Sequence, residues 1–146
     1  MLTNRLTLRI EWGDCDPAGI AYFPRYLEYF DTCTRALFER AGFRKRDLLK
    51  TYGIVGIPVV DLKARFMVPS RFGEDVTVES SIIEWRNSSF VVQHRLRKGD
   101  VLAIECLETR VWVAHPEGDP EKMAGRPIPH EVKERFVTVP ESNAAM

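Results

Sequence analysis

The residues best placed to do chemistry lie between Gly13 and Pro24, where the chain reads GDCDPAGIAYFP. Asp16 puts a carboxylate just ahead of a helix that the pattern predicts to begin at Pro24. A helix N-terminus has free N–H groups and a partial positive charge, which stabilise an oxyanion or polarise a carbonyl. A carboxylate beside it suits acyl transfer from a thioester, because one group attacks or activates water while the other accepts negative charge. Gly19 permits the tight backbone path that brings the loop close to a ligand.

The same loop also fits a purely structural role. Asp before Pro-x-Gly is a common turn and Asp near a helix start is commonly a cap, so residue type and spacing alone favour these roles for Asp16. Cys15 has no histidine in the motif to activate its thiolate and is not expected to be the nucleophile. Asp14 is expected to continue the preceding strand, with nothing near it to act on.

This loop must be positioned by the elements on either side of it. Apolar residues alternate with polar ones from Leu6 to Trp12, which predicts a half-buried strand. At 100° per residue, a helix from Pro24 to Ala41 has one largely apolar face, and Gly42 is suited to end it. That apolar face holds Leu27, Phe30, Thr34, Leu37, Phe38 and Ala41.

After the helix the pattern returns mostly to period two. It predicts a short helix within 44–52, strands at 60–68, 76–86, 90–96 and 102–114, an irregular segment at 115–129 and a short helix at 130–136. An apolar helix face needs something to bury it. A strand, a long helix and four strands in a meander therefore predict an α+β fold, with a five-stranded antiparallel sheet around one long central helix. The length fits a single domain over residues 1–146.

Composition argues against several functional classes. The 146 residues carry 21 basic and 21 acidic side chains, and a net charge of zero argues against binding to nucleic acid or a membrane surface. No apolar run is long enough to span a bilayer and the N-terminus lacks a signal-peptide pattern, so we expect a cytoplasmic protein. Three scattered cysteines predict neither a disulfide framework nor a zinc site. The histidines are also too scattered for a metal site and are expected at the surface or rim: His94, His115 and His130.

Three stretches, IEWGDCDPAGIAYFPRYLEYFD, VGIPVVDLKARF and IIEWRNSSFVVQH, resemble the 4-hydroxybenzoyl-CoA thioesterase family of hotdog-fold proteins, from about Leu6 to Val113. The resemblance implies that Asp16 acts on the thioester carbonyl as nucleophile or general base, and that the backbone N–H of Phe23 polarises its oxygen. It also implies that Tyr22 and Phe23 line the acyl pocket. The resemblance implies no metal or redox cofactor. Coenzyme A is part of the substrate. The loop has neither the histidine of other hotdog thioesterases nor the histidine–acid pair of hotdog dehydratases.

Asp31 is a second candidate, at the border of the apolar helix face. The family has an aspartate at this position near the acyl-binding region, so the resemblance implies a contact with the acyl group. An exposed i,i+4 ion pair with Arg35 is an equally good account. Aromatic side chains stack well on a planar ring, so Tyr22, Phe23 and Phe30 together with Asp31 predict a pocket that prefers a hydroxylated benzoyl group.

The turn from Glu84 to Ser89 joins two predicted strands. Coenzyme A carries several phosphate charges, which need cations and hydroxyl or backbone donors. The resemblance places the nucleotide end near this turn, with Arg86, Ser88 and Ser89 as contacts. Taken alone, the turn reads as solvated surface.

Together these features predict an acyl-CoA thioesterase that hydrolyses an aroyl-CoA such as a hydroxybenzoyl-CoA. The alternatives are a short-chain or fatty acyl-CoA thioesterase and a non-catalytic protein that binds acyl thioesters. A sheet wrapped on one helix leaves a face and an edge uncovered. We therefore expect the protein to form at least a homodimer, with a tetramer as the favoured assembly. In the family the acyl group lies between two subunits, so the resemblance implies an active site at the subunit interface.

Overall fold

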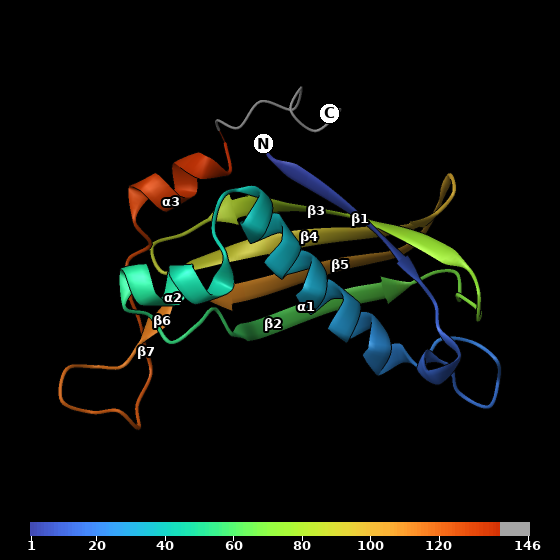
Figure 1. The fold of residues 1–146 in the computed structure, drawn as a ribbon, viewed down its shortest axis with the longest axis horizontal. Coiled ribbons are helices and arrows are strands. Elements are labelled where there is room, and N and C mark those ends of the chain that lie inside the picture. The colour runs from blue at the N-terminus through green and yellow to red at the C-terminus, as the bar shows by residue number, and fades with distance from the viewer. Residues whose placement is uncertain (138–146) are drawn as a thin grey trace.

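The computed structural model describes residues 1–137 (Figure 1). The main strands are β1 (Thr3–Arg9), β2 (Val59–Phe66), β3 (Asp75–Trp85), β4 (Ser89–Lys98) and β5 (Val101–Val111). The helices are α1 (Phe23–Arg40), α2 (Lys45–Tyr52) and α3 (His130–Arg135), and the short elements are η1 (Trp12–Asp14), β6 (Val113–Ala114) and β7 (Ala124–Gly125). All three predicted helices are confirmed to within one residue at each end. None of the helices in this part of the chain is both long and apolar enough to cross a membrane.

The five main strands form one antiparallel sheet in the order β1-β3-β4-β5-β2. The predicted five-stranded antiparallel sheet is confirmed, but the predicted four-strand meander is wrong for β2. Only β3, β4 and β5 follow one another, while β2 pairs with β5 at the far edge, for example Ala64 with Cys106. Residues 67–74 connect β2 to β3, a longer link than the two to five residues usual in a hairpin. This length lets the chain pass from one edge of the sheet to a strand near the other.

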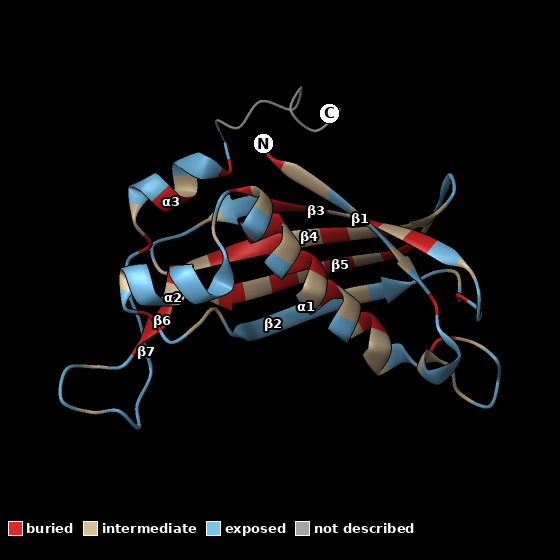
Figure 2. Ribbon diagram, in the orientation of Figure 1, coloured by how far each residue is buried: buried red, intermediate tan, exposed pale blue. Residues whose placement is uncertain are grey.

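Helix α1 runs across one face of this sheet, which supplies the burial that its apolar side requires (Figure 1). Its C-terminal half packs through Leu37 and Phe38 into one core cluster, and its N-terminal half packs through Tyr26 and Phe30 into a second. Leu27 is only partly buried, so the buried arc of the helix is centred slightly away from the predicted one. Figure 2 shows the buried strand residues concentrated beneath α1.

Predicted strand boundaries differ from the structure in several places, because pairing partners, rather than alternation, decide where a strand ends. β1 ends at Arg9, the last residue paired with β3, and the chain then forms the turn η1. β5 ends at Val111, and Trp112 separates it from β6. The segment 115–129 is not wholly irregular, because β7 within it pairs with β6.

Strand β2 lies at the edge of the sheet and is mostly exposed, as its pale blue colour in Figure 2 shows. Its exposed side chains include large apolar ones: Val59, Val60, Leu62 and Phe66. An edge strand has unpaired N–H and C=O groups, so an apolar edge of this kind is suited to pairing with another chain.

Candidate active site

The loop from Cys15 to Ala21 is a small hairpin closed by its own backbone. The N–H of Asp16 donates to the carbonyl of Ile20 at 2.9 Å, and Cys15 pairs with Ala21. The N–H of Gly19 donates to the carbonyl of Asp16 at 2.9 Å, with Gly19 at a left-handed φ of 81° that favours glycine. Asp16 Oδ1 also accepts the Ala18 N–H at 2.9 Å, so the predicted turn forms. The turn uses one carboxylate oxygen of a partly exposed side chain.

Helix α1 begins immediately after this hairpin, with Tyr22 as its N-cap and Pro24 in its first turn. The N–H of Tyr22 donates to the Asp14 carbonyl at 2.8 Å, which fixes the entry of the chain into the helix. Within residues 1–137, no acceptor takes up the N–H of Phe23, the first residue of the helix. The N-terminus of α1 therefore has a free donor, as required of an oxyanion site.

Asp14 has more partners than its sequence position suggested. Its carboxylate accepts the Glu11 N–H at 3.0 Å and lies 3.9 Å from Nε of Arg25 on α1. The expectation that Asp14 has nothing near it is wrong, because the chain leaves the strand pattern at η1 and turns back on itself there. Asp14 thus links the two ends of the loop that carries Asp16.

An apolar pocket of about 210 Å³ lies against the start of α1, with Phe23 and Tyr26 on one side and the segment 66–69 on the other. Tyr22 is exposed and packs edge-on against Phe23, but it does not line this pocket. Phe30 is fully buried and stacks on His94 at 4.9 Å between ring centroids. The expected cluster of three aromatic rings is therefore divided. Seven residues of helix separate Phe23 from Phe30 by about 10 Å.

Asp31 lies on α1 beside a different pocket, between α1, α2 and the segment 56–57. Its Oδ1 accepts a hydrogen bond from Arg110 Nη2 at 2.9 Å. No ion pair joins it to Arg35 in the part of the chain that the structure describes, so the predicted i,i+4 pair does not form. Eight residues of helix place Asp31 about 12 Å beyond Phe23, and one chain does not bring the two into the same pocket.

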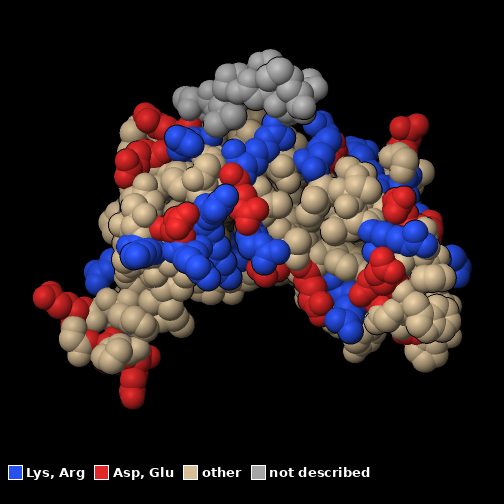
Figure 3. Space-filling model, viewed as in Figure 1, with Lys and Arg blue, Asp and Glu red and all other residues tan. Residues whose placement is uncertain are grey.

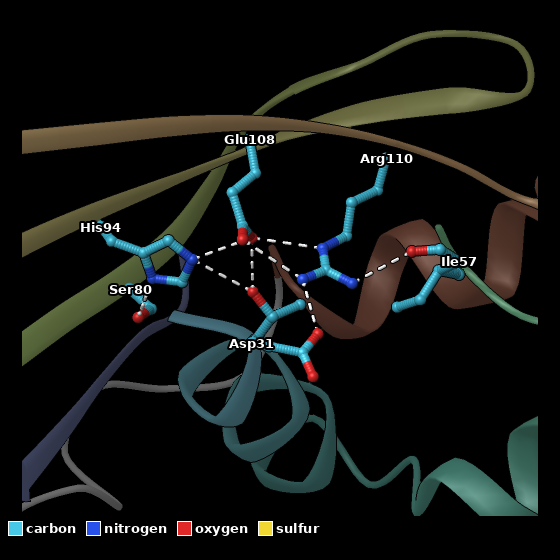
Figure 4. Close-up of polar contacts among 7 residues, drawn as sticks. Asp31, Ile57, Ser80, His94, Glu108 and Arg110 are labelled. Atoms are coloured by element: carbon cyan, nitrogen blue, oxygen red, sulfur yellow. Dashed lines mark hydrogen bonds and ion pairs between the residues drawn. The ribbon is translucent and has the colours of Figure 1, made fainter. Parts of the chain in front are cut away.

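A buried group of polar side chains lies under the middle of α1 (Figure 4). Oε1 of Glu108 accepts hydrogen bonds from Thr34 Oγ1 at 2.8 Å and Arg110 Nε at 3.2 Å, and lies 2.9 Å from His94 Nε2. The other ring nitrogen of His94 lies 2.7 Å from Ser80 Oγ. His94 is 0% exposed, Glu108 2% and Arg110 5%. We call these residues, with Asp31, the buried network.

The environment of Glu108 stabilises its ionised form. Burial by itself raises the pKa of Glu108, but the hydrogen bond and charge of His94 and the Arg110 guanidinium outweigh it and lower this pKa to about 2. Burial also raises the pKa of the nearby thiols of Cys33 and Cys106 to about 12, with the charge of Glu108 adding to the effect. These thiols are therefore poor nucleophiles.

Sequence reasoning missed the buried network and placed His94 at the surface or rim, which is wrong. A signal was present, because His94 falls on the inward face of its strand with Phe90, Val92 and Leu96. Glu108 and Arg110 likewise share the inward parity of β5 with Ile104 and Cys106. Polar residues at inward positions of neighbouring strands predict a satisfied buried cluster.

Ser80, His94 and Glu108 have the order of partners found in serine hydrolases, but their location excludes that chemistry. A nucleophilic serine must touch the carbonyl carbon of its substrate. Ser80 is fully buried in the sheet beneath α1, so a thioester has no access to it. The half-buried Cys15 donates its thiol to the Glu11 carbonyl. Among residues 1–137, no three His, Cys, Asp or Glu side chains form a cluster able to hold a metal ion.

The turn with Arg86, Ser88 and Ser89 joins β3 to β4 as predicted. The N–H of Arg86 donates to the Ser89 carbonyl at 2.8 Å, and the exposed Arg86 side chain pairs with Glu84. This turn follows the end of β3, whereas the loop with Asp16 lies near its start, where Ile10 bonds Glu74. Ten strand steps of about 3.3 Å separate the two regions by roughly 33 Å. One chain therefore does not bring Arg86, Ser88 and Ser89 to Asp16.

Comparison with known proteins gives consistent matches. Residues 10–140 match the thioesterase-like superfamily. The chain is 37% identical to the 4-hydroxybenzoyl-CoA thioesterase of Pseudomonas sp. (strain CBS-3), over 83% of this chain and 88% of that protein. A structure of a 4-hydroxybenzoyl-CoA thioesterase variant bound to 4-hydroxybenzoyl-CoA aligns with a TM-score of 0.84 at 31% identity, covering 92% of this chain and 98% of the other. A gentisyl-coenzyme A thioesterase aligns with a TM-score of 0.78 at 27% identity, covering 92% and 100%.

Proposed function

Because the chain belongs to the thioesterase-like superfamily and is an acyl-CoA thioester hydrolase with the hotdog fold, we propose that its substrate is an aroyl-CoA such as a hydroxybenzoyl-CoA. The relatives named above act on aryl thioesters of coenzyme A, which supports this substrate class. The observation that carries the proposal is that the hairpin with the Asp16 carboxylate leads directly into a helix whose first N–H, that of Phe23, is free and whose start borders an apolar pocket.

The reaction follows from these groups. The N–H of Phe23, supported by the positive end of α1, donates to the thioester carbonyl oxygen and stabilises its negative charge as the tetrahedral centre forms. Asp16 either attacks the carbonyl carbon or removes a proton from the water that does. The carbon–sulfur bond breaks, and coenzyme A leaves as the thiolate. In the first route water then hydrolyses the acyl–Asp16 anhydride, and both routes release the free acid.

Recognition of a ring hydroxyl falls to Asp31, and it requires two chains. Asp31 and Phe23 line different pockets, and the eight residues between them turn their side chains about 80° apart around α1, which supports placing them against one benzoyl group from different chains. The active site therefore combines Asp16 and Phe23 of one subunit with Asp31 of the partner subunit. The exposed apolar edge of β2 supports a homodimer at least. We propose that Arg86, Ser88 and Ser89 of a second chain contact the nucleotide of coenzyme A.

Thiol release from a panel of thioesters tests this function. Hydroxybenzoyl-CoA should give a higher kcat/KM than benzoyl-CoA, and benzoyl-CoA a higher value than hexanoyl-CoA. Equal rates on hexanoyl-CoA and hydroxybenzoyl-CoA would reject the aryl specificity and favour a short-chain or fatty acyl-CoA thioesterase. Saturable binding without thiol release would instead indicate a non-catalytic thioester-binding protein.

A further inference from the structure

The buried network ends at the surface in one place only among the described residues, the carboxylate of Asp31. Glu108, His94 and Thr34 are inaccessible, and Arg110 is nearly so, whereas the Asp31 side chain is 68% exposed. Burying an ion costs desolvation free energy, and this cost is offset only when the hydrogen bonds of the ion are satisfied. The buried network meets this requirement and reaches one exposed carboxylate beside a pocket, so its effect at the surface is exerted through Asp31.

The guanidinium of Arg110 is held in place on three sides. Its Nε and Nη2 bond the two oxygens of Glu108 at 3.2 Å each, and its Nη1 donates to the carbonyl of Ile57 at 3.1 Å. Glu108 in turn is fixed by His94 and Thr34 (Figure 4). With these contacts made, the planar guanidinium cannot rotate, and Nη2 points at Asp31 Oδ1.

This contact orients an exposed side chain that would otherwise sample several rotamers. One oxygen of Asp31 is bound to Arg110, and within residues 1–137 no hydrogen bond or ion pair engages the other. The pocket beside it has apolar walls from Phe38, Leu48 and Ile57. Figure 3 shows basic side chains interspersed with acidic ones on this face. Arg35 and Lys45 also line this pocket. An oriented acceptor oxygen on an apolar wall suits the hydroxyl of an aromatic ring.

We propose that Arg110, held by Glu108, is the positioning residue that orients Asp31 for recognition of the ring hydroxyl. The proposal rests on the role given to Asp31 in the proposed function. Arg110 is 5% exposed, and four hydrogen bonds tie its guanidinium to Glu108, Ile57 and Asp31, so we place its action on Asp31. Its effect is therefore on the preference between hydroxylated and plain substrates.

The test compares the ratio of kcat/KM for hydroxybenzoyl-CoA over benzoyl-CoA in Asp31→Ala, Arg110→Lys and the double variant. Asp31→Ala should lower this ratio about tenfold or more, as expected for loss of one hydrogen bond to a charged group. Arg110→Lys keeps the positive charge but loses the planar guanidinium that bonds Glu108 and Asp31 together. It should lower the ratio at least threefold. The double variant should have the ratio of Asp31→Ala alone, because Arg110 acts through Asp31. Arg97→Lys, which changes an Arg–Glu79 pair elsewhere on the sheet, should leave the ratio unchanged.

The outcomes separate this inference from the function on which it rests. A wild-type ratio in Arg110→Lys, with a reduced one in Asp31→Ala, overturns the role of Arg110 and leaves hydroxyl recognition standing. Additive losses in the double variant also overturn it. An unchanged ratio in Asp31→Ala overturns hydroxyl recognition and this inference together. If Arg110→Lys does not fold, a variant with both Arg110→Met and Glu108→Gln replaces it, because this variant leaves no unpaired carboxylate in the core. The same fall in the ratio is expected.

Discussion

The two acidic regions along α1 differ in access to solvent, and this difference separates their chemistry. At the start of the helix, Asp16 is on a partly exposed hairpin beside a free N–H, where a substrate can reach it. Under the middle of the helix, Glu108 has more hydrogen-bond partners and its pKa is lowered by them, yet it is only 2% exposed. A perturbed pKa is often taken to mark a catalytic group, but here it marks the group that holds other groups in place.

Turnover should fall most when the exposed carboxylate of Asp16 is changed. Asp16→Asn removes both a nucleophile and a base, while the amide oxygen can still accept the Ala18 N–H and preserve the turn. We expect kcat to fall at least ~100-fold with a much smaller change in KM. Steady-state thiol release measures both values. Asp100→Asn, at the turn between β4 and β5, is the matched control, and near-normal kcat in a folded Asp16→Asn would remove Asp16 from the reaction.

The next effect concerns whether one chain can be active alone. Light scattering at micromolar concentration should show at least a dimer. Val60→Lys places a charge on the exposed edge strand β2, and should give monomers that have lost most of the turnover. Val101→Lys, the same substitution at another exposed valine, should keep assembly and activity. A fully active monomer would contradict an active site shared between subunits.

A mixed dimer tests which chain supplies each carboxylate. Dimers with one Asp16→Asn chain and one Asp31→Ala chain can be isolated with two different affinity tags. If Asp16 and Asp31 of different chains share a site, one site in this dimer is intact and the preference for hydroxybenzoyl-CoA returns. The ratio of kcat/KM for hydroxybenzoyl-CoA over benzoyl-CoA should be about tenfold higher than in the Asp31→Ala homodimer. Should both residues act within one chain, the mixed dimer will keep the preference of Asp31→Ala.

The smallest effect on turnover is expected at Glu108. Its pKa of about 2 lies below the ordinary value of 4.5, so its ionised form stabilises the fold above about pH 4.5 and this contribution is lost as the pH falls toward 2. The contribution is on the order of 3 kcal/mol by the usual conversion. Urea unfolding of Glu108→Gln should therefore show a deficit in the free energy of unfolding at pH 5 that narrows by pH 3.

Two comparisons check this assignment. Glu105→Gln, an exposed acid on the same strand, should show little deficit at either pH. Hydrolysis of benzoyl-CoA by Glu108→Gln should fall less than tenfold, in contrast to Asp16→Asn. A loss of turnover as large as that of Asp16→Asn would mean that the buried region takes part in the chemistry.

How much of the site could be predicted depended on how far apart its parts lie in the chain. The turn at Asp16, the left-handed Gly19 and the start of α1 are closed by contacts within about ten residues, so turn and helix signals were enough to predict them. The pairing of Ile20 with Arg71, by contrast, was not predicted. The partner of Asp31 was missed because Arg110 is 79 residues away and reaches it only through the packing of α1 on β5.

Local patterns were enough to predict the main helices, the strands and the loop that carries Asp16, because helix periodicity, strand alternation and turn residues act locally. Tertiary structure alone decided that β2 occupies the edge beside β5, that His94, Glu108 and Arg110 meet beneath α1, and that Asp31 and Phe23 lie in separate pockets. These features depend on which strands pair and on how α1 crosses them. Such contacts join residues far apart in the chain, and their energy depends on burial and geometry that exist only once the sheet has closed around the helix.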